Sequence, residues 1–254
     1  MSIYISFIVG GLDMSRVLIA DDDSFITLFY SDFLAKEKNI EIVDIVHNGI
    51  DAYNSYMKYR PDVLLLDLNM PGMNGIELID KLCEDQEEKK KNNIIIISGY
   101  LDQIVPYNTA KVYRMIHKDK NYNLLIDTIN EIQEELDYKK LEEKIDSLFF
   151  RSKISSSYLK GTPYLKKAAI YCYYDENILY DNNLIAMYDK IALHETTKHI
   201  TGKNVLWSLE SLIDSYQKKV NKSLLSSYFS GYEDNRGLTP KYLLELLTIE
   251  LKKQ

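Results

Sequence analysis

Short apolar runs alternate with amphipathic stretches over the first 138 residues of the chain. Runs that are nearly continuous in Val, Ile and Leu are typical of parallel strands buried on both faces, and the amphipathic stretches between them predict crossover helices. The predicted strands are 16–20, 41–46, 62–67, 94–98 and 112–117, and the predicted helices are 24–37, 49–59, 75–84, 101–110 and 122–148. This alternation predicts a doubly wound α/β sheet, with the acid-bearing strand 41–46 at an edge.

The strand pattern disappears after the Ser-rich stretch 151–157, which we interpret as a loop or linker. Thr162-Pro163 and Thr239-Pro240 each place a cap residue before a first-turn proline, which is a helix-start signal. The predicted helices are 162–174, 184–195, 203–219 and 239–252. We therefore predict an all-α second half, with a boundary near residue 140.

The two halves also differ in charge. Residues 1–140 hold 15 Lys and Arg against 24 Asp and Glu, whereas residues 141–254 hold 16 against 14. An acidic first half suits a cation site. A near-neutral second half allows contact with nucleic acid but shows no strongly basic patch that would indicate it. The distant cysteines, Cys83 and Cys172, favour a reducing compartment.

The sequence predicts a cytoplasmic protein without a membrane segment. No apolar run approaches the roughly 20 residues that a membrane helix needs. The apolar stretch 3–9 has no basic flank and no small-residue cleavage site, so we do not interpret it as a signal peptide. Our hypothesis is that Met14 is the natural start and that residues 1–13 come from an upstream start choice.

Ionisable side chains follow the predicted strands where these end. Asp21 and Asp22 follow the first strand, Asp67 closes the third and Lys118 follows the fifth. In an open parallel sheet the carboxyl ends of the strands meet where ligands bind. The three carboxylates suit a hard cation, most simply Mg²⁺. A carboxylate there can attack a phosphoryl group, and the lysine can pair with phosphoryl oxygens.

Two neighbouring features complete this prediction. Ser98 ends the fourth strand and can donate its hydroxyl to the same phosphoryl oxygens. The tight loop 69–75 (NMPGMNG) can deliver a backbone carbonyl to a metal before the next helix starts. The competing interpretation is structural, because Asp23 and Ser24 are good helix caps and acids after a strand often only cap. The occurrence of all these residues in order, each at a strand end, favours the phosphoryl-transfer site.

These motifs resemble the receiver domain of two-component response regulators. The resemblance rests on Asp21-Asp22, the loop 67–75, Ser98-Gly99 and Lys118, and covers about residues 15–138. It implies a flavodoxin-like five-stranded parallel sheet. It also implies that a histidine kinase or phosphotransfer protein phosphorylates Asp67, with Mg²⁺ or another divalent cation such as Ca²⁺.

The resemblance assigns roles to individual residues. It implies that the side chains of Asp22 and Asp67 and the backbone carbonyl of Asn69 bind the metal, with Asp21 assisting. Ser98 and Lys118 would contact the phosphoryl group. Two positions depart from the receiver pattern: Met115 stands where receivers usually carry Tyr or Phe, and Asp119 stands where they usually carry Pro.

Segments 184–195 and 203–219 fit a helix-turn-helix, in which the second helix enters the major groove of DNA. The predicted DNA-contacting residues lie in the turn and along the second helix: Lys198, Thr201, Lys203, Asn204, Ser208, Ser211, Lys218 and Lys219. Two helices joined through a glycine also occur in many α-domains, so packing alone is the competing interpretation. Trp207 fits either packing or a contact with a partner.

Segments 158–168 and 187–192 resemble the effector domain of sporulation-initiation regulators, the stage zero sporulation protein A family. The resemblance covers about residues 141–252 and implies phosphorylation-induced dimers that bind double-stranded DNA through a helix-turn-helix and regulate transcription. The family's recognition helix is rich in arginine. Here the matching helix carries Glu210 and Asp214, and the preceding turn is longer.

The sequence therefore predicts a receiver domain over 15–138, a linker and first effector helix over 139–157, and an all-α sporulation-regulator-like effector over 158–254. The expected protein is a phosphorylation-activated transcription regulator, with RNA polymerase as a further partner. The receiver would catalyse its own aspartyl phosphorylation, and no separate enzymatic domain is expected. The alternative is a receiver-controlled protein-interaction module whose effector has lost DNA readout.

Overall fold

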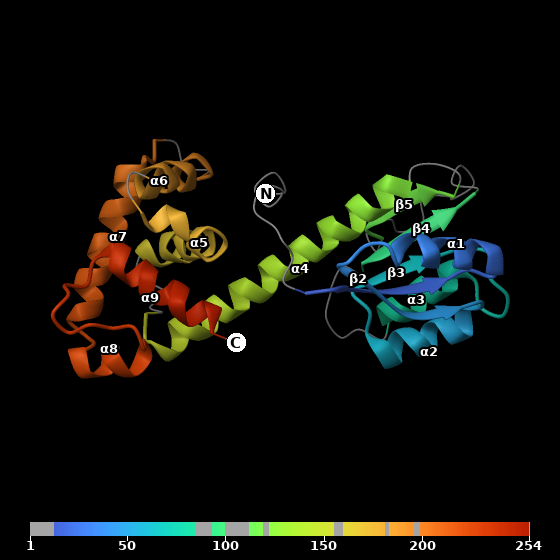
Figure 1. The fold of residues 1–254 in the computed structure, drawn as a ribbon, viewed down its shortest axis with the longest axis horizontal. Coiled ribbons are helices and arrows are strands. Elements are labelled where there is room, and N and C mark those ends of the chain that lie inside the picture. The colour runs from blue at the N-terminus through green and yellow to red at the C-terminus, as the bar shows by residue number, and fades with distance from the viewer. Residues whose placement is uncertain are drawn as a thin grey trace. The chain divides into compact units, whose positions relative to one another are not determined.

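The structure, a computed structural model, describes residues 13–84, 93–99, 112–118, 122–154, 160–180, 183–195 and 199–253. The chain forms two compact units, the first ending at Asp137 and the second beginning at Tyr138 (Figure 1). The predicted helix 101–110 lies outside the described residues. Among the described helices, none is long and apolar enough to cross a membrane.

The first unit contains a five-stranded parallel sheet. Its strands are β1 (Ser15–Ala20), β2 (Ile40–Val46), β3 (Val63–Leu66), β4 (Ile94–Ser98) and β5 (Arg114–His117). They lie in the order β2-β1-β3-β4-β5, and every neighbouring pair is parallel. The predicted α/β sheet is therefore confirmed, and β2 lies at an edge, as its acids predicted. Strand order reverses between β1 and β3, which is where a ligand site is expected.

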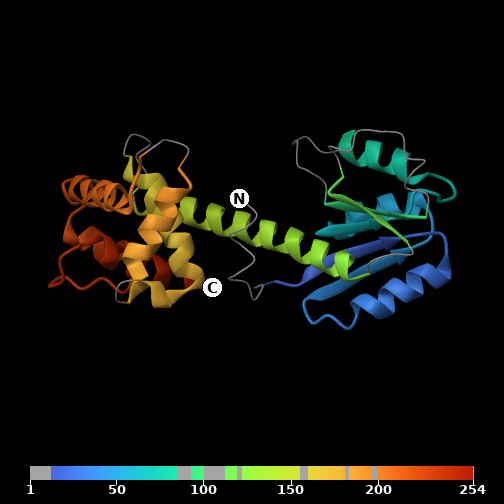
Figure 2. The same ribbon diagram turned by 90° about the horizontal axis from the view of Figure 1, so that it is seen from above.

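Helices cover both faces of this sheet. They are α1 (Ser24–Leu34), α2 (Gly49–Tyr59), α3 (Gly75–Glu84) and α4 (Tyr122–Arg151). Because successive strand residues point to opposite faces, Ile19 packs in a cluster with α1 and α4, whereas Leu18 packs in a second cluster with α2 and α3. Figure 2 shows helices on both sides of the sheet. Burial on both faces explains why β1, β3 and β4 are rich in Val, Ile and Leu.

The second unit is helical throughout its described part. After the end of α4 come α5 (Gly161–Tyr174), the 3₁₀-helix η4 (Glu176–Leu179), α6 (Asn183–Leu193), α7 (Gly202–Gln217), α8 (Lys222–Tyr228) and α9 (Pro240–Lys252). One hydrophobic core joins them, with Ile145 of α4, Leu165 of α5, Leu209 of α7 and Leu247 of α9 among its buried members. The predicted helical character is confirmed, while η4 and α8 were not predicted.

Helix α4 is longer than predicted. It continues past residue 148 to Arg151, so residues 139–151 of the segment predicted as linker and first effector helix belong to a 30-residue helix that begins in the first unit. Ile129 lies in the core of the first unit, and Ile145 lies in the core of the second. Lys139 and Lys140, between these positions, are exposed. One helix therefore contributes to both hydrophobic cores.

Candidate functional site

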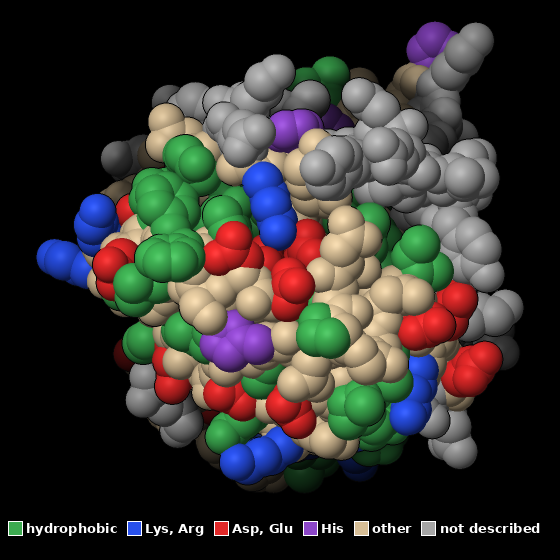
Figure 3. All heavy atoms as spheres, turned by 90° about the vertical axis from the view of Figure 1, so that its right-hand side faces the viewer, with side chains coloured by type: hydrophobic (Ala, Val, Ile, Leu, Met, Phe, Trp, Pro, Cys, Tyr) green, Lys and Arg blue, Asp and Glu red, His purple; other side chains and the backbone are tan. Residues whose placement is uncertain are grey.

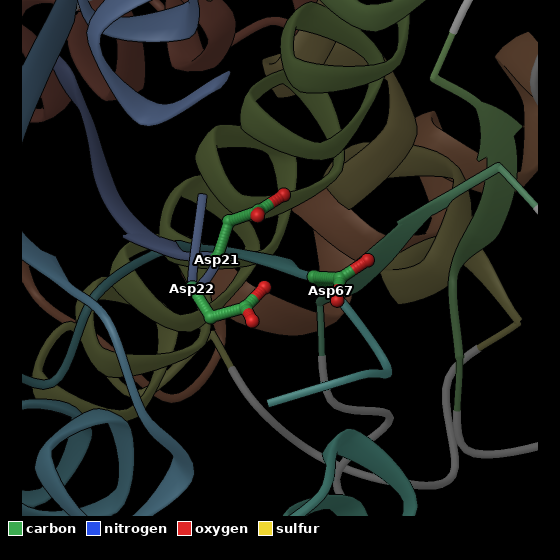
Figure 4. A group of neighbouring side chains, drawn as sticks. All are labelled: Asp21, Asp22 and Asp67. Carbon is green, nitrogen blue, oxygen red and sulfur yellow. The ribbon is translucent and has the colours of Figure 1, made fainter. Parts of the chain in front are cut away.

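Three carboxylates gather at the carboxyl end of the sheet, beside the point where strand order reverses. Because β1 pairs with β3 and Ala20 lies opposite Leu66, the residues that follow these strands are neighbours. The backbone N–H of Asp67 donates to the carbonyl of Ala20 at 2.8 Å. One ligand atom from each of Asp21, Asp22 and Asp67 lies within 4.8 Å of the others (Figure 4). Figure 3 shows acidic side chains gathered near the middle of one face, next to a basic side chain.

Lys118 joins two of these carboxylates. Its Nζ lies 2.6 Å from Oδ2 of Asp21 and 2.9 Å from Oδ1 of Asp67. Both aspartates are nearly fully buried, with 3% and 4% of their surfaces exposed, whereas Asp22 is exposed. Three carboxylates and one ammonium leave an excess of negative charge at a partly buried position, and this combination favours a divalent cation.

Burial and pairing act on the protons of this group. Burial raises the pKa of Asp21, and this effect outweighs the hydrogen bond from Lys118, which lowers it. For Lys118, burial alone would lower the pKa, but the hydrogen bonds to Asp21 and Asp67 raise it above its usual value. The lysine therefore stays protonated across the physiological range and provides a fixed positive charge.

Backbone groups orient the two buried carboxylates. The N–H of Asp23 donates to Oδ1 of Asp21 at 3.0 Å, and the N–H of Asn69 donates to Oδ2 of Asp67 at 2.7 Å. Asp23 also caps α1, since its Oδ1 accepts from the N–H of Phe25 at 2.8 Å. The structural interpretation of Asp23 as a cap is thus correct, and it coexists with the carboxylate cluster.

The loop that follows β3 is held tightly. A Cβ added at Gly75 would lie 2.6 Å from the carbonyl oxygen of Asp67, so this first residue of α3 has no room for a side chain. Gly72 has a φ of +78°, in the left-handed region that favours glycine. The amide of Asn74 donates to Glu77 at 3.0 Å and the amide of Glu77 donates to Asn74 at 2.9 Å, a reciprocal cap at the start of α3. The predicted metal-ligand loop therefore has a defined shape.

The remaining predicted residues of this site lie close by. The backbone N–H of Lys118 donates to the carbonyl of Ser98 at 3.2 Å, and Ser98 itself is buried. Asn69 is exposed at the start of its loop. Met115, at the position where receivers usually carry an aromatic ring, is 38% exposed. Asp119 lies outside the described residues.

His47 is a site residue that the sequence analysis missed. Its Nδ1 lies 3.0 Å from the backbone carbonyl oxygen of Asp21. It directly follows β2, as Asp21 follows β1 and Asp67 follows β3. The available signal was a polar residue directly after the edge strand β2. The sequence prediction considered only carboxylates, Ser98 and Lys118 at the strand ends.

The segments predicted as a helix-turn-helix correspond to α6 and α7, which pack against each other. Oδ1 of Asp189 on α6 accepts from the N–H of Gly202 at 3.1 Å, and a Cβ at Gly202 would lie 2.2 Å from that oxygen. The glycine therefore allows the start of α7 to approach α6 closely. This contact fixes the junction of the two helices but does not establish a DNA-binding motif.

Two of the predicted DNA-contacting residues cap α7. Thr201 and Asn204 form a capping box: the N–H of Thr201 donates to Oδ1 of Asn204 at 2.9 Å, and Oγ1 of Thr201 accepts from the backbone N–H of Asn204. The hydroxyl of Ser208 donates to the carbonyl of Asn204 at 2.8 Å. Lys198 lies outside the described residues. The other predicted contacts are exposed on or just after α7: Lys203, Ser211, Lys218 and Lys219.

The exposed face of α7 also carries groups that suit DNA poorly. Trp207 is 62% exposed, and Glu210 and Asp214 are exposed on the same helix. The apolar side of α7 packs into the core: Val205, Leu209, Leu212, Ile213 and Tyr216 are buried, and Leu206 is partly buried. The pattern of apolar positions therefore predicted the buried side of this helix.

Comparison with known proteins gives matches to the first unit. The family described as the response regulator receiver domain matches residues 17–130. A protein-glutamate methylesterase/protein-glutamine glutaminase of Bacillus subtilis is 42% identical over 71 residues, which are 28% of this chain and 20% of that protein. Transcriptional regulatory protein LiaR of Bacillus subtilis is 30% identical over 103 residues, 41% of this chain and 44% of that protein.

Solved structures match about half of the chain. The response regulator domain of Thermotoga maritima CheB is 20% identical with a TM-score of 0.42, and the match covers 47% of this chain and 96% of that one. A LuxR-family DNA-binding response regulator from Staphylococcus aureus is 24% identical with a TM-score of 0.39, covering 47% and 99%. The chain spans about a fifth of the methylesterases that it matches, so these matches show no separate enzymatic domain.

Proposed function

Since residues 17–130 match the response regulator receiver domain family, we propose that this chain is a phosphorylation-activated response regulator with Asp67 as its phosphoacceptor. A receiver implies a histidine kinase or another phosphodonor as its partner. The observation that carries the proposal is Lys118, whose ammonium contacts the carboxylate of Asp67 at 2.9 Å beside two further aspartates. A nucleophile, a fixed cation and cation ligands thus lie together.

The donor set of this site fits a hard divalent cation. It consists of oxygens from Asp21, Asp22 and Asp67 and the backbone carbonyl of Asn69, the ligand type that Mg²⁺ and Ca²⁺ prefer. A bound cation would neutralise charge on the phosphoryl oxygens as they approach the carboxylates.

The chain's own residues then divide the chemistry. A carboxylate oxygen of Asp67 attacks phosphorus and forms the new P–O bond, while the bond from phosphorus to the donor breaks and its electron pair leaves with the donor. Lys118 exchanges part of its contact with Asp67 for a phosphoryl oxygen. The hydroxyl of Ser98 donates to another phosphoryl oxygen. Asp21 keeps one carboxylate contact with Lys118 and so positions the ammonium.

Phosphate uptake from a small donor tests this assignment. Wild-type protein incubated with acetyl phosphate and Mg²⁺ should gain one phosphoryl group by intact mass, and the gain should disappear when the cation is chelated. Asp67→Asn should lose it, whereas Asp127→Asn, on the exposed surface of α4, should retain it. Uptake by Asp67→Asn at the wild-type rate would place the phosphoacceptor elsewhere.

For the output we propose transcriptional control by the second unit. The proposed division is a receiver over 15–138, a linker and first effector helix over 139–157, and a sporulation-regulator-like effector over 158–254 that binds DNA as a dimer and acts on RNA polymerase. Support comes from the name of LiaR as a transcriptional regulatory protein and from Lys203 and Lys218, exposed near the two ends of α7.

Salt dependence tests DNA binding. Full-length protein, phosphorylated and not, should be titrated by fluorescence anisotropy against a random duplex pool at two salt concentrations, and the retained duplexes sequenced. Lysine contacts with phosphates predict affinity that falls steeply with salt. Lys203→Glu should weaken binding, whereas Lys139→Glu on α4 should not. Absence of binding by the phosphorylated protein would contradict a DNA-binding output.

Trp207 favours a second candidate output. An exposed tryptophan beside Glu210 and Asp214 suits a protein surface better than a polyanion. In this alternative α7 contacts a protein, and the complex should resist salt. Trp207→Ala would then weaken the complex more than Lys203→Ala.

A further inference from the structure

A hollow of about 490 Å³ lies in the second unit, lined by the end of α7, by α8 and by the loop before α9. Its lining comes from segments 217–225 and 232–238, all within the described residues. Small-molecule sites typically enclose about 300–1,000 Å³ and combine apolar walls with a few polar groups. The size of this hollow therefore fits a small organic ligand.

The hollow has an apolar side. Val220, Leu225 and Leu238 line it, and each is buried, with exposed fractions of 3%, 2% and 7%. The ring of Tyr232 also lines it and is stacked on Tyr242, with 6.2 Å between ring centroids. An aromatic ring and branched aliphatic side chains favour a flat, apolar ligand group.

The loop that forms one wall is held in place. The hydroxyl of Tyr242 on α9 accepts from the N–H of Glu233 at 2.5 Å and donates to the carbonyl of Gly231 at 3.2 Å. Arg236 lies over the ring of Tyr242 at 4.0 Å and pairs with Glu245 at 2.7 Å. These contacts fix the wall before any ligand binds, which lowers the entropic cost of binding.

The rim of the hollow favours an anion. Lys222 and Arg236 line it together with one acid, Asp234, and Arg236 is already paired with Glu245. The excess positive charge comes from Lys218 and Lys219, which are exposed directly before the lining residue Val220. Nζ of Lys222 donates to the backbone carbonyl of Asp234 at 2.9 Å and lies 3.3 Å from its Oδ1, in a pair whose side chains are 67% and 70% exposed. Such exposed ion pairs contribute little stability, so a ligand anion can replace Asp234 at small cost.

We propose that this hollow binds a small aromatic anion: a flat ring that carries one carboxylate, sulfonate or phosphate group. The ring would lie against Leu225, Leu238 and Tyr232, and the anionic group would pair with Lys222. Gln217, the last residue of α7, also lines the hollow, so the ligand would contact the proposed output helix. The second unit would then respond to a small ligand as well as to phosphorylation of Asp67. Binding of this ligand requires neither phosphorylation of Asp67 nor DNA.

The probe for this site is 2-naphthoate, titrated into full-length, isotope-labelled protein and followed by backbone amide chemical shifts. Saturable shifts should concentrate in residues 217–238, with a dissociation constant below about 1 mM. Lys222→Glu should weaken binding about tenfold, because a charge-assisted contact is replaced by repulsion. The matched control Lys139→Glu, at an exposed position of α4, should bind as wild type.

A filling variant tests the hollow itself. Gly237 lines it, and a Cβ there meets nothing within 4 Å, so Gly237→Leu should fold normally and obstruct the ligand. Thermal unfolding would verify that the variant is folded. Loss of binding in folded Gly237→Leu supports the proposal. Unchanged binding in that variant, shifts spread over both units, or equal affinity for neutral 2-naphthylmethanol would overturn it.

Discussion

Lys118 shows how one residue can serve both stability and chemistry. Its ammonium lies between two carboxylates that are almost completely buried. Without that cation, the carboxylates of Asp21 and Asp67 would repel each other at close range in a poorly solvated position. The ammonium must partly leave these carboxylates when a phosphoryl group arrives. In the unphosphorylated site it is therefore already positioned to contact that group.

Lys118→Met should destabilise the protein by about 2–4 kcal/mol at pH 7 without Mg²⁺, because it leaves buried carboxylates without their cation. Urea unfolding would measure this loss. Mg²⁺ should stabilise the variant more than the wild type, since the metal replaces the missing charge. Lys139→Met is the matched control and should change little. Equal stability of Lys118→Met and wild type would contradict the bridging role.

The stability loss in Lys118→Met should depend on pH. Burial raises the pKa of Asp21, so its ionised form costs stability above the usual aspartate pKa. That cost is larger without Lys118, and it fades as pH falls and the carboxylates take up protons. The stability difference between Lys118→Met and wild type should therefore be smaller near pH 4 than at pH 7.

At the residue scale, the sequence predicted the members of the acidic cluster but not their contacts. Each member ends or follows a strand, and parallel strands bring those positions together. The bridge from Lys118 to two carboxylates and the contact of His47 with Asp21 depend on side-chain geometry, which spacing does not encode. The mutual capping of Thr201 and Asn204 was also missed, because Asn is not the Glu or Gln of the usual capping box.

At the scale of elements, α1 presents an unusual apolar surface next to the acidic cluster. Phe25, in its first turn, is 85% exposed, and Leu28 and Phe29 are 57% and 42% exposed. Phe29 also contacts Tyr122 of α4, with ring centroids 4.7 Å apart. A donor protein must approach closely enough to bring its phosphoryl group to Asp67, so it would cover this surface.

Phe25→Ser should therefore slow transfer from a histidine-phosphorylated donor protein about tenfold, while uptake from acetyl phosphate stays at the wild-type rate. Rapid-quench assays with both donors would measure the rate of transfer from the donor protein and the rate of uptake from acetyl phosphate separately. Leu193→Ser, which alters another exposed apolar residue, on α6, should affect neither reaction. A parallel slowing with acetyl phosphate would show damage to the site instead of lost docking.

Element prediction succeeded where the physical signal was strong. The five strands were predicted within two residues at each end. In β1, β3 and β4, burial on both faces leaves few polar interruptions. The short helices η4 and α8, of 4 and 7 residues, span too few turns for a period of 3.6 to show. The end of α4 was set too early, because Leu148 and Phe149 pack into the second core and extend the helix to Arg151.

At the scale of the whole molecule, α4 is one helix that belongs to two hydrophobic cores. Ile129 and Ile145 mark its two buried parts, and the exposed lysines 139 and 140 lie between them. The helix is continuous from Tyr122 to Arg151, so we expect a change at one of these parts to be carried along its hydrogen-bonded backbone.

Replacement of Lys139 and Lys140 by glycine should weaken this connection, at about 1 kcal/mol of helix stability per glycine. Phosphate uptake should be unchanged, while the difference in amide exchange of α7 between phosphorylated and unphosphorylated protein should shrink. The double alanine variant keeps the helix and should behave as wild type. An undiminished response in the glycine variant would show that α4 does not carry the signal.

The exposure of Trp207 has a spectroscopic consequence. The chain contains one tryptophan, so all of its indole fluorescence arises from the outer side of α7. An indole in water emits at longer wavelengths than one that is covered by an apolar surface, and stacking on a base quenches its emission. A partner that covers Trp207 therefore changes the wavelength or the intensity of tryptophan emission. Binding to α7 can thus be followed without an added label.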